Sequence, residues 1–144
     1  METVRHAVHG EIAVIRSILS DSGLPADDFI DGGVTFLVAD SGGTIVGTIG
    51  LELYPPRGLL RSAAVLPSFR DRGIGALLVE AVIREARSRS LSELVLLTTT
   101  AEKFFGRMGF GRIERATLDG EILTSGQFTG TTCAPAAVMR MMVR

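Results

Sequence analysis

Apolar residues in the first quarter of the chain recur at the spacing of a helix. Isoleucine or leucine stands at positions 12, 15, 18 and 19, so an amphipathic helix is predicted within residues 10–23. Gly23 and Pro25 predict its end. A short strand is predicted before it at residues 3–8, and a further helical turn after it at residues 24–33.

The next stretch changes to runs of β-branched and apolar residues separated by turn residues. These runs predict strands at 34–40, 44–54 and 59–65. Ser-Gly-Gly at 41–43 predicts a hairpin turn, and Pro-Pro-Arg-Gly at 55–58 predicts a second turn. Successive strands joined by such short turns are expected to run antiparallel.

The second half alternates helices with strands. A helix is predicted over residues 73–89. Its inward face is expected to consist of Ile74, Leu77, Leu78, Ala81, Val82 and Glu85. The expected elements after it are a buried strand over 93–99, a short helix over 101–108, a strand over 110–115, helical turns over 116–128 and a last strand over 136–143. This order predicts a mixed α/β fold, with antiparallel hairpins first and a β-α-β-α-β half second.

The composition fits one globular domain spanning residues 1–144. A net charge of −1 argues against bulk attraction to nucleic acid or to an anionic membrane, so neither is expected as a partner. The single cysteine, Cys133, fits a reducing compartment. The N-terminal residues lack the continuous apolar core of a signal peptide, and no run approaches the roughly 18 apolar residues that span a bilayer. A soluble, cytoplasmic protein is predicted.

A predicted strand, a glycine turn and a helix start follow one another closely in residues 63–78, AAVLPSFRDRGIGALL. Gly73 and Gly75 allow close approach to the backbone, and the first amides of a helix have no partner within it, so this turn can hold a phosphate. Arg70 and Arg72 add positive charge. An ordinary helix start with two turn glycines fits the same residues, and local chemistry leaves both interpretations open. A dinucleotide fingerprint and a P-loop do not fit, because Leu78 occupies the third small position and no Gly-Lys-Ser/Thr follows.

The same stretch resembles motif A of the GNAT family of N-acetyltransferases, in which Arg/Gln-x-x-Gly-x-Gly/Ala follows a Val-x-Pro. Here Arg70, Gly73 and Gly75 fill the matching positions. The segment AEKFFGRMGF, 101–110, resembles the family's later helix, which commonly ends Phe-Tyr-x-x-x-Gly-Phe. The resemblance covers the whole chain. It implies a central mixed, mostly antiparallel sheet of six to seven strands, splayed between the fourth and fifth strands and flanked by helices.

The resemblance also implies acetyl-CoA as co-substrate and no metal. In the family, the loop amides hold the pyrophosphate, and the pantetheine arm pairs with a strand edge like an extra strand. Carried onto this chain, the loop residues are Arg70, Asp71, Arg72, Gly73, Ile74, Gly75 and Ala76. The strand residues are Ala63, Ala64 and Val65, and Phe104 is assigned to the same site.

Family members usually transfer the acetyl group by direct attack of the amine, so Cys133 is expected to be a packed residue rather than a nucleophile. Many of them use a tyrosine as general acid where this chain has Phe105, which leaves that role unassigned. Water or a hydroxyl from Thr98 to Thr100 is a candidate, Thr98 first. Strand propensity and helix capping are the alternative explanation of these threonines.

Glu52 and Arg61 are the candidates on the acceptor side. A tight turn at Pro56-Arg57 would make paired positions sum to 113 and place Glu52 directly opposite Arg61. One interpretation is a cross-strand ion pair, which would add little stability if it were exposed. The other is that Glu52 draws a proton from the amine through water, and that Arg61 binds a substrate anion with Tyr54 nearby. His6 and His9 are expected at the surface.

The acceptor itself is suggested only by resemblance. The segment LLTTTAEKFFGRMGF, 96–110, is similar to the acetyltransferase domain of N-acetylglutamate synthases. A larger match, including Gly50-Leu51-Glu52, Leu59 to Ser62 and Ala136 to Met139, is to small arsenic-resistance N-acetyltransferases. These likenesses imply a small-molecule amine, amino-acid-like or an arsenical, as the acceptor. A monomer or homodimer is expected. Acetylation of a protein amine and a non-catalytic acyl-CoA-binding module stay open as alternatives.

Overall fold

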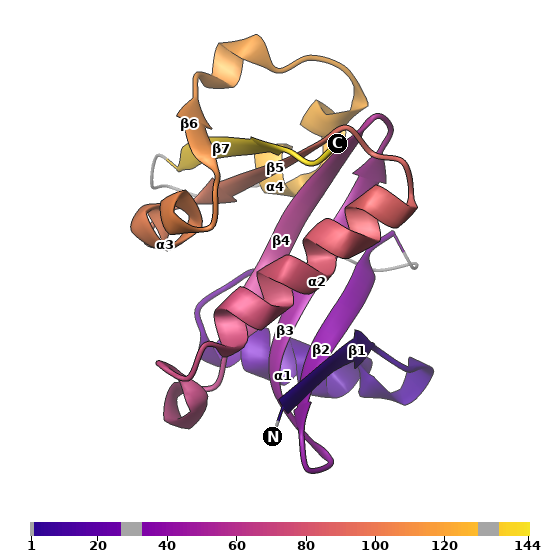
Figure 1. Ribbon diagram of the computed structural model, residues 1–144, viewed down its shortest axis with the longest axis vertical. Helices are drawn as coiled ribbons and strands as arrows, with labels where there is room; N and C mark the ends of the chain where they lie inside the picture. The colour runs from indigo at the N-terminus through magenta and orange to yellow at the C-terminus, as the bar shows by residue number, and fades with distance from the viewer. Residues whose placement is uncertain (1, 27–32, 130–135) are drawn as a thin grey trace.

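The computed structural model describes residues 2–26, 33–129 and 136–144. These residues build a seven-stranded sheet with the order β1-β2-β3-β4-β5-β7-β6, antiparallel except between β4 and β5 (Figure 1). The strands are β1 Glu2–His6, β2 Thr35–Ser41, β3 Thr44–Tyr54, β4 Arg57–Val65, β5 Glu93–Thr98, β6 Gly111–Ile113 and β7 Ala137–Met142. The predicted mixed, mostly antiparallel sheet is confirmed.

Helices cover both faces of the sheet. They are α1 Ile12–Asp21, α2 Ile74–Ser88, α3 Glu102–Arg107 and α4 Gly126–Thr129, with 3₁₀ turns at His9–Glu11, Pro67–Phe69, Arg115–Thr117 and Glu121–Thr124. In Figure 1, α2 crosses the front of the long strands and α1 lies behind them. The two long helices pack on separate apolar clusters. The cluster under α2 includes Leu78 and Val82, and the cluster under α1 includes Ile15 and Leu19.

The buried face of α2 is rotated from the predicted one. Val79, Ile83 and Ala86 are buried, whereas Leu77 is 41% exposed. With 3.6 residues per turn, this buried arc is centred near Val82 and leaves Leu77 outside it. The predicted inward position of Leu77 is therefore wrong.

The turn between β3 and β4 differs from both forms of the sequence expectation. Tyr54 pairs with Arg57, so the two turn residues are Pro55 and Pro56. Gly58 is a strand residue that pairs with Leu53. A Cβ at this position would lie 2.8 Å from Leu51 Cδ1. Glycine is needed at this position for close packing rather than for the turn.

β4 and β5 separate soon after they meet. Their parallel pairing is limited to Arg57–Glu93, Gly58–Leu94 and Leu59–Val95. Beyond Leu59 the two strands diverge, which confirms the predicted splay between the fourth and fifth strands. The backbone edge of β4 beyond this point faces the opening rather than β5.

The predicted helical turns before the last strand are present, as two 3₁₀ turns and α4. They cover a third apolar cluster on the sheet, formed by Leu59, Val95, Leu118, Ile122 and Val138. The strand predicted over 110–115 is shorter than expected, because β6 ends at Ile113. Most of the helical turn predicted over 24–33 lies outside the described residues, and so does Cys133.

Candidate functional site

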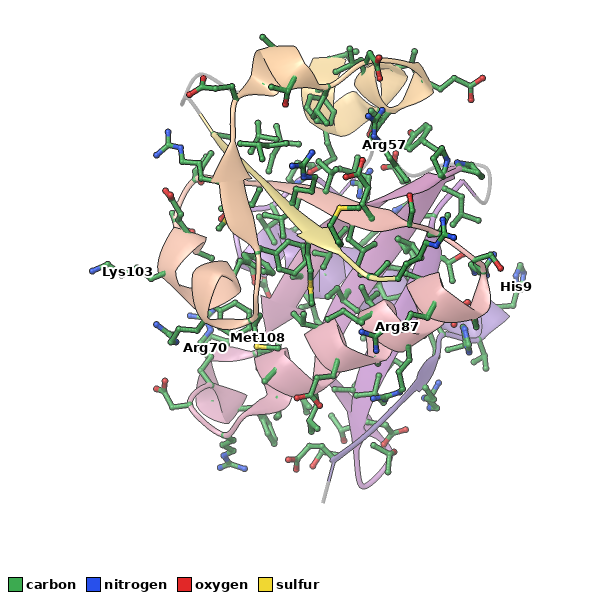
Figure 2. The ribbon with its side chains drawn as sticks, turned by 45° about the horizontal axis from the view of Figure 1, so that its top comes forward. His9, Arg57, Arg70, Arg87, Lys103 and Met108 are labelled. Carbon is green, nitrogen blue, oxygen red and sulfur yellow. The ribbon has the colours of Figure 1, made fainter. Side chains whose placement is uncertain are left out.

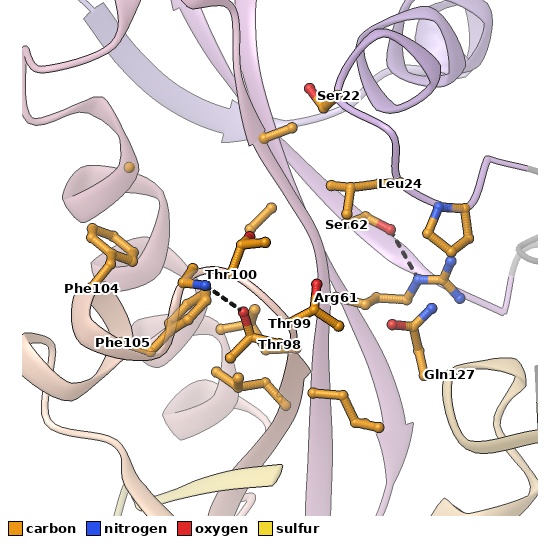
Figure 3. Close-up of a pocket in the computed structure, with 18 of the residues that line it drawn as sticks. Ser22, Leu24, Arg61, Ser62, Thr98, Thr99, Thr100, Phe104, Phe105 and Gln127 are labelled. Atoms are coloured by element: carbon orange, nitrogen blue, oxygen red, sulfur yellow. Dashed lines mark hydrogen bonds between the residues drawn. The ribbon is translucent and has the colours of Figure 1, made fainter. Parts of the chain in front are cut away.

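A pocket of about 980 Å³ lies where β4 and β5 separate. Gly75 and Leu78 of α2 and Phe104 of α3 line one side of it. Leu24, after α1, and Gln127 of α4 line it on the other side of β4 (Figure 3). The splay thus opens a passage from one face of the sheet to the other.

The 70–76 loop has the geometry of an anion cradle. Gly73 has a φ of +79°, a conformation that glycine adopts without strain, and a Cβ there would meet nothing within 4 Å. No side chain of the described residues caps the first amides of α2. Gly75 allows the Phe104 ring to pack closely against the start of α2, because a Cβ at this position would lie 3.3 Å from Phe104 Cζ. The helix start therefore presents unpaired N–H groups and its positive dipole end beside open space.

The two arginines of this loop have different roles in the fold. Arg70 Nε donates to the carbonyl oxygen of Val65 at 3.0 Å, which ties the loop to the end of β4. The guanidinium of Arg72 stacks on the Phe69 ring, 4.9 Å from its centroid. Of the predicted cofactor residues, the pocket is lined by Ala63, Ala64, Val65, Arg70, Gly75 and Phe104. Asp71, Arg72, Gly73, Ile74 and Ala76 do not line it.

A β-bulge shapes the strand edge that faces the opening. Thr48 pairs with Ala64 but Gly50 pairs with Arg61, so β4 carries one extra residue between these pairs. Ser62 lies in this bulge with a φ of +56°, which is uncommon for a residue with a side chain and is often found at functional sites. The sequence reasoning missed the bulge, since Leu-Leu-Arg-Ser-Ala-Ala-Val contains no glycine or other local signal for it.

A polar cluster lies on the Arg61 side of the pocket. Arg61 Nη1 donates to Glu52 Oε2 at 2.6 Å, and Arg61 Nε donates to Ser62 Oγ at 2.9 Å (Figure 3). The hydroxyls of Tyr54 and Ser125 donate to Glu52 Oε1 at 2.5 and 2.7 Å. Burial, together with the hydrogen bond to Glu52, raises the pKa of the Tyr54 phenol above its usual value.

The predicted register of this pair is wrong. Paired positions sum to 111 rather than 113, so Glu52 faces Leu59 and Arg61 faces Gly50. The two side chains meet diagonally on one face of the sheet. The pair is buried, with the Arg61 side chain 0% and the Glu52 side chain 9% accessible. Arg61 lines the pocket, whereas Glu52 and Tyr54 lie behind it.

Phe105 and Thr98 have clear structural partners. Phe105 is buried, with edge-on ring contacts to Phe104 at 5.1 Å and Phe110 at 5.8 Å. Thr98 Oγ1 accepts the backbone N–H of Ala101 at 2.9 Å, at the start of α3. Both residues line the pocket, so a proton-donating role for Thr98 stays a prediction.

Other candidates lie away from the pocket. His6 and His9 are exposed, as predicted, and His9 projects outward in Figure 2. Among residues 2–26, 33–129 and 136–144, no group of three histidine, cysteine, aspartate or glutamate side chains is arranged to hold a metal ion. No helix within the described part of the chain is long and apolar enough to cross a membrane.

The sequence of the chain is similar to those of known acetyltransferases. Relatives include an uncharacterised N-acetyltransferase of Chlorobaculum tepidum, 38% identical over 81 residues, which are 56% of this chain and 52% of that protein. An amino-acid acetyltransferase of Mycobacterium tuberculosis is 35% identical over 81 residues, 56% of this chain and 46% of that protein. These matches span about half of each relative's length.

A solved structure supports the fold over its full extent. N-acetylglutamate synthase from Neisseria gonorrhoeae, complexed with coenzyme A and N-acetyl-glutamate, superimposes with a TM-score of 0.85 at 20% identity. The likeness covers 100% of this chain and 35% of that chain. The sequence profile of the acetyltransferase (GNAT) family matches residues 12–110, which include the loop, the splayed strands and α3. The chain therefore belongs to the acetyltransferase (GNAT) family.

Proposed function

We propose that this chain is an acetyl-CoA-dependent N-acetyltransferase whose acceptor is the primary amine of a small, anionic, amino-acid-like molecule. The observation that carries the proposal is a pocket that passes through the splayed sheet, with the 70–76 loop near one end and Arg61 at the other. Two reactants entering from opposite faces would meet beside the β4 bulge, so an amine would reach a thioester without a covalent enzyme intermediate.

The cofactor side is supported by three features of the backbone. The amides at the start of α2 are uncapped, and the dipole there favours a pyrophosphate. Gly73 leaves open space, and the edge of β4 from Ala63 to Val65 is free of β5. Acetyl-CoA would supply an acetyl thioester at this edge. A backbone N–H of the bulge would stabilise charge that develops on the carbonyl oxygen.

The acceptor side is supported by Arg61. Arg61 is a lining residue of the pocket, with Gln127 beside it in Figure 3, and an arriving acceptor would have to uncover its buried guanidinium. Charge-assisted hydrogen bonds from arginine suit a carboxylate or a related oxyanion. The motif likeness to arsenic-resistance N-acetyltransferases makes an arsenical amino acid a specific candidate. The amino-acid acetyltransferases among the relatives favour the same broad class of acceptor.

The proton donor for the leaving thiolate is proposed among water and the threonines at the end of β5. Thr98, Thr99 and Thr100 all line the pocket. Phe105, which has no ionisable group, is the observation that favours the second candidate function, a non-catalytic acyl-CoA-binding module. That candidate predicts binding of acetyl-CoA without turnover.

A thiol-release screen tests the proposal. The chain is incubated with acetyl-CoA and a panel of amino acids, arsenical amino-acid analogues, neutral amines and a lysine-containing peptide. The expected result is amine-dependent thiol release that is fastest with an anionic member of the panel. Turnover restricted to the peptide would favour a protein acceptor, and tight acetyl-CoA binding without turnover would favour the binding module.

A further inference from the structure

The carboxylate of Glu52 is surrounded by hydrogen-bond donors from three separate parts of the chain. Tyr54 donates from the same strand, Arg61 from β4, and Ser125 from the turn that precedes α4. Both carboxylate oxygens therefore accept hydrogen bonds. Glu52 does not line the pocket, whereas its partner Arg61 does. A group placed in this way contacts the residues that form the wall rather than a molecule inside the pocket.

We propose that Glu52 is a positioning residue of the acceptor site, which fixes the buried Arg61 guanidinium next to the pocket and anchors the α4 segment to the sheet. This inference rests on the proposed function, because it assigns Arg61 to the acceptor. It replaces a role for Glu52 as proton acceptor, since the carboxylate contacts other side chains rather than the pocket.

The neighbours of Arg61 are consistent with a side chain held in one place. Gly50 faces it across the strands, and a Cβ on Gly50 would lie 3.4 Å from Arg61 Cγ, so the arginine stem lies close over the glycine. The guanidinium is then fixed at Nε by Ser62 and at Nη1 by Glu52. Since ordering a long side chain costs entropy, an arginine fixed before binding gives a stronger anion site than a free one.

Ser125 extends the same control to the α4 segment, which lies beside Arg61 in Figure 3. Its hydroxyl donates to Glu52 and accepts the backbone N–H of Gln127 at 3.2 Å. Gln127 lines the pocket. Glu52 thus connects Arg61 with the α4 segment, although Ser125 lies 73 positions from Glu52 in the sequence.

Steady-state kinetics of Glu52→Gln test the positioning role. The expected result is a rise in the acceptor KM of roughly tenfold or more, the range expected when a hydrogen bond to a charged group is lost, with the acetyl-CoA KM unchanged. The pH profile of kcat should keep its position. A lowered kcat with a shifted pH profile and a parent-like acceptor KM would identify Glu52 as the base and overturn the proposal.

The single tyrosine gives a readout that needs no turnover. Tyr54 is the only tyrosine and the chain has no tryptophan, so the ultraviolet absorbance of the phenolate reports on this cluster alone. The groups that influence its pKa are Glu52 and Ser125, which bond to it, and the charge of Arg61. In Glu52→Gln the phenol is expected to ionise at lower pH, because the negative neighbour that disfavours phenolate is gone. If Tyr54 ionises in this variant at the same pH as in the parent, the proposed network is wrong, even if the variant proves inactive.

Two matched controls separate positioning from loss of stability. Glu93 is also buried and pairs with Arg57, the first residue of β4, outside this cluster. Glu93→Gln should lower stability while leaving the acceptor KM and the Tyr54 titration unchanged. Ser125→Ala should raise the acceptor KM, whereas Thr124→Ala should not, because the Thr124 hydroxyl bonds only within its own turn, to the carbonyl of Glu121. Equal effects of Glu52→Gln and Glu93→Gln on the acceptor KM would contradict the assignment.

Discussion

Arg61 and Glu52 form an ion pair that is hidden from solvent, with 2.6 Å between Arg61 Nη1 and Glu52 Oε2. Buried pairs of this kind are costly to desolvate, so they add less stability than their geometry suggests. The pair is not needed to close the sheet, because β3 and β4 are joined by backbone pairing along most of their length. The place of Arg61 among the pocket-lining residues is what connects the pair to the proposed acceptor site.

Arg61→Ala is expected to raise the KM for an anionic acceptor while the KM for acetyl-CoA stays unchanged. Loss of a charge-assisted hydrogen bond costs roughly 1.5–3 kcal/mol, or about ten- to a hundredfold in affinity. Arg61→Lys keeps the charge but loses the planar fork, so its effect should be smaller. Steady-state kinetics with both substrates varied make the measurement. Parent-like KM values for both substrates in the alanine variant would show that the pair has only a structural role.

Gly73→Ala should weaken acetyl-CoA binding. Its Cβ would occupy the open space over the helix start, where the pyrophosphate is proposed to lie. Gly42→Ala is the matched control, because Gly42 also has a positive φ, +60°, with nothing within 4 Å of its Cβ position. Calorimetric titration should give weaker binding only in the Gly73 variant. Equal affinities in the two folded variants would exclude the loop as the cofactor site.

Phe105→Leu should reduce stability by roughly 1–3 kcal/mol, a common range for a substitution in a packed core. The ring contacts Phe104 and Phe110 edge-on and has no proton to give, so kcat should change little. Phe105→Tyr should equal or exceed the parent's turnover, because it restores the hydroxyl that the family commonly has at this position. Denaturant unfolding and turnover are measured together. A large loss of turnover in the leucine variant, at unchanged stability and cofactor affinity, would contradict this prediction.

The lowered pKa of Glu11 predicts that the N-terminal region loses stability in acid. Hydrogen bonds from Arg5, at 2.9 and 2.7 Å, and from the backbone of Val8 lower its pKa from 4.5 to about 2. A depressed carboxylate pKa stabilises the fold above the unfolded value, and this contribution is lost as the pH falls from 4.5 towards 2. The free energy of unfolding of the parent should therefore fall over this range more steeply than that of Glu11→Gln. Identical pH dependence in both would remove the assigned role.

The elements that the sequence predicted well are those with local signals. β3 runs from Thr44 to Tyr54 as expected, because alternating apolar residues lie between two turn sequences. The glycine loop carries its own pattern of glycines and arginines. By contrast, the register of β3 against β4 depends on which two residues form the turn, and an error of one position there changed the partner of Glu52.

The rest of the site depends on contacts between distant segments. Ser125 lies 73 positions from Glu52, and no local pattern indicates that the two meet. The bulge at Ser62 requires a left-handed backbone at a residue that gives no sign of it. The assignment of residues 1–144 to one domain stays a prediction.

A crystal structure of the chain with coenzyme A and the best acceptor from the screen tests the central claim most directly. The account predicts the pyrophosphate on the amides of residues 70–76 and the thiol at the β4 edge near Ser62. It places the acceptor's anionic group on Arg61, across β4 from α2. Coenzyme A bound elsewhere, or an acceptor that leaves Arg61 without contact, would contradict it.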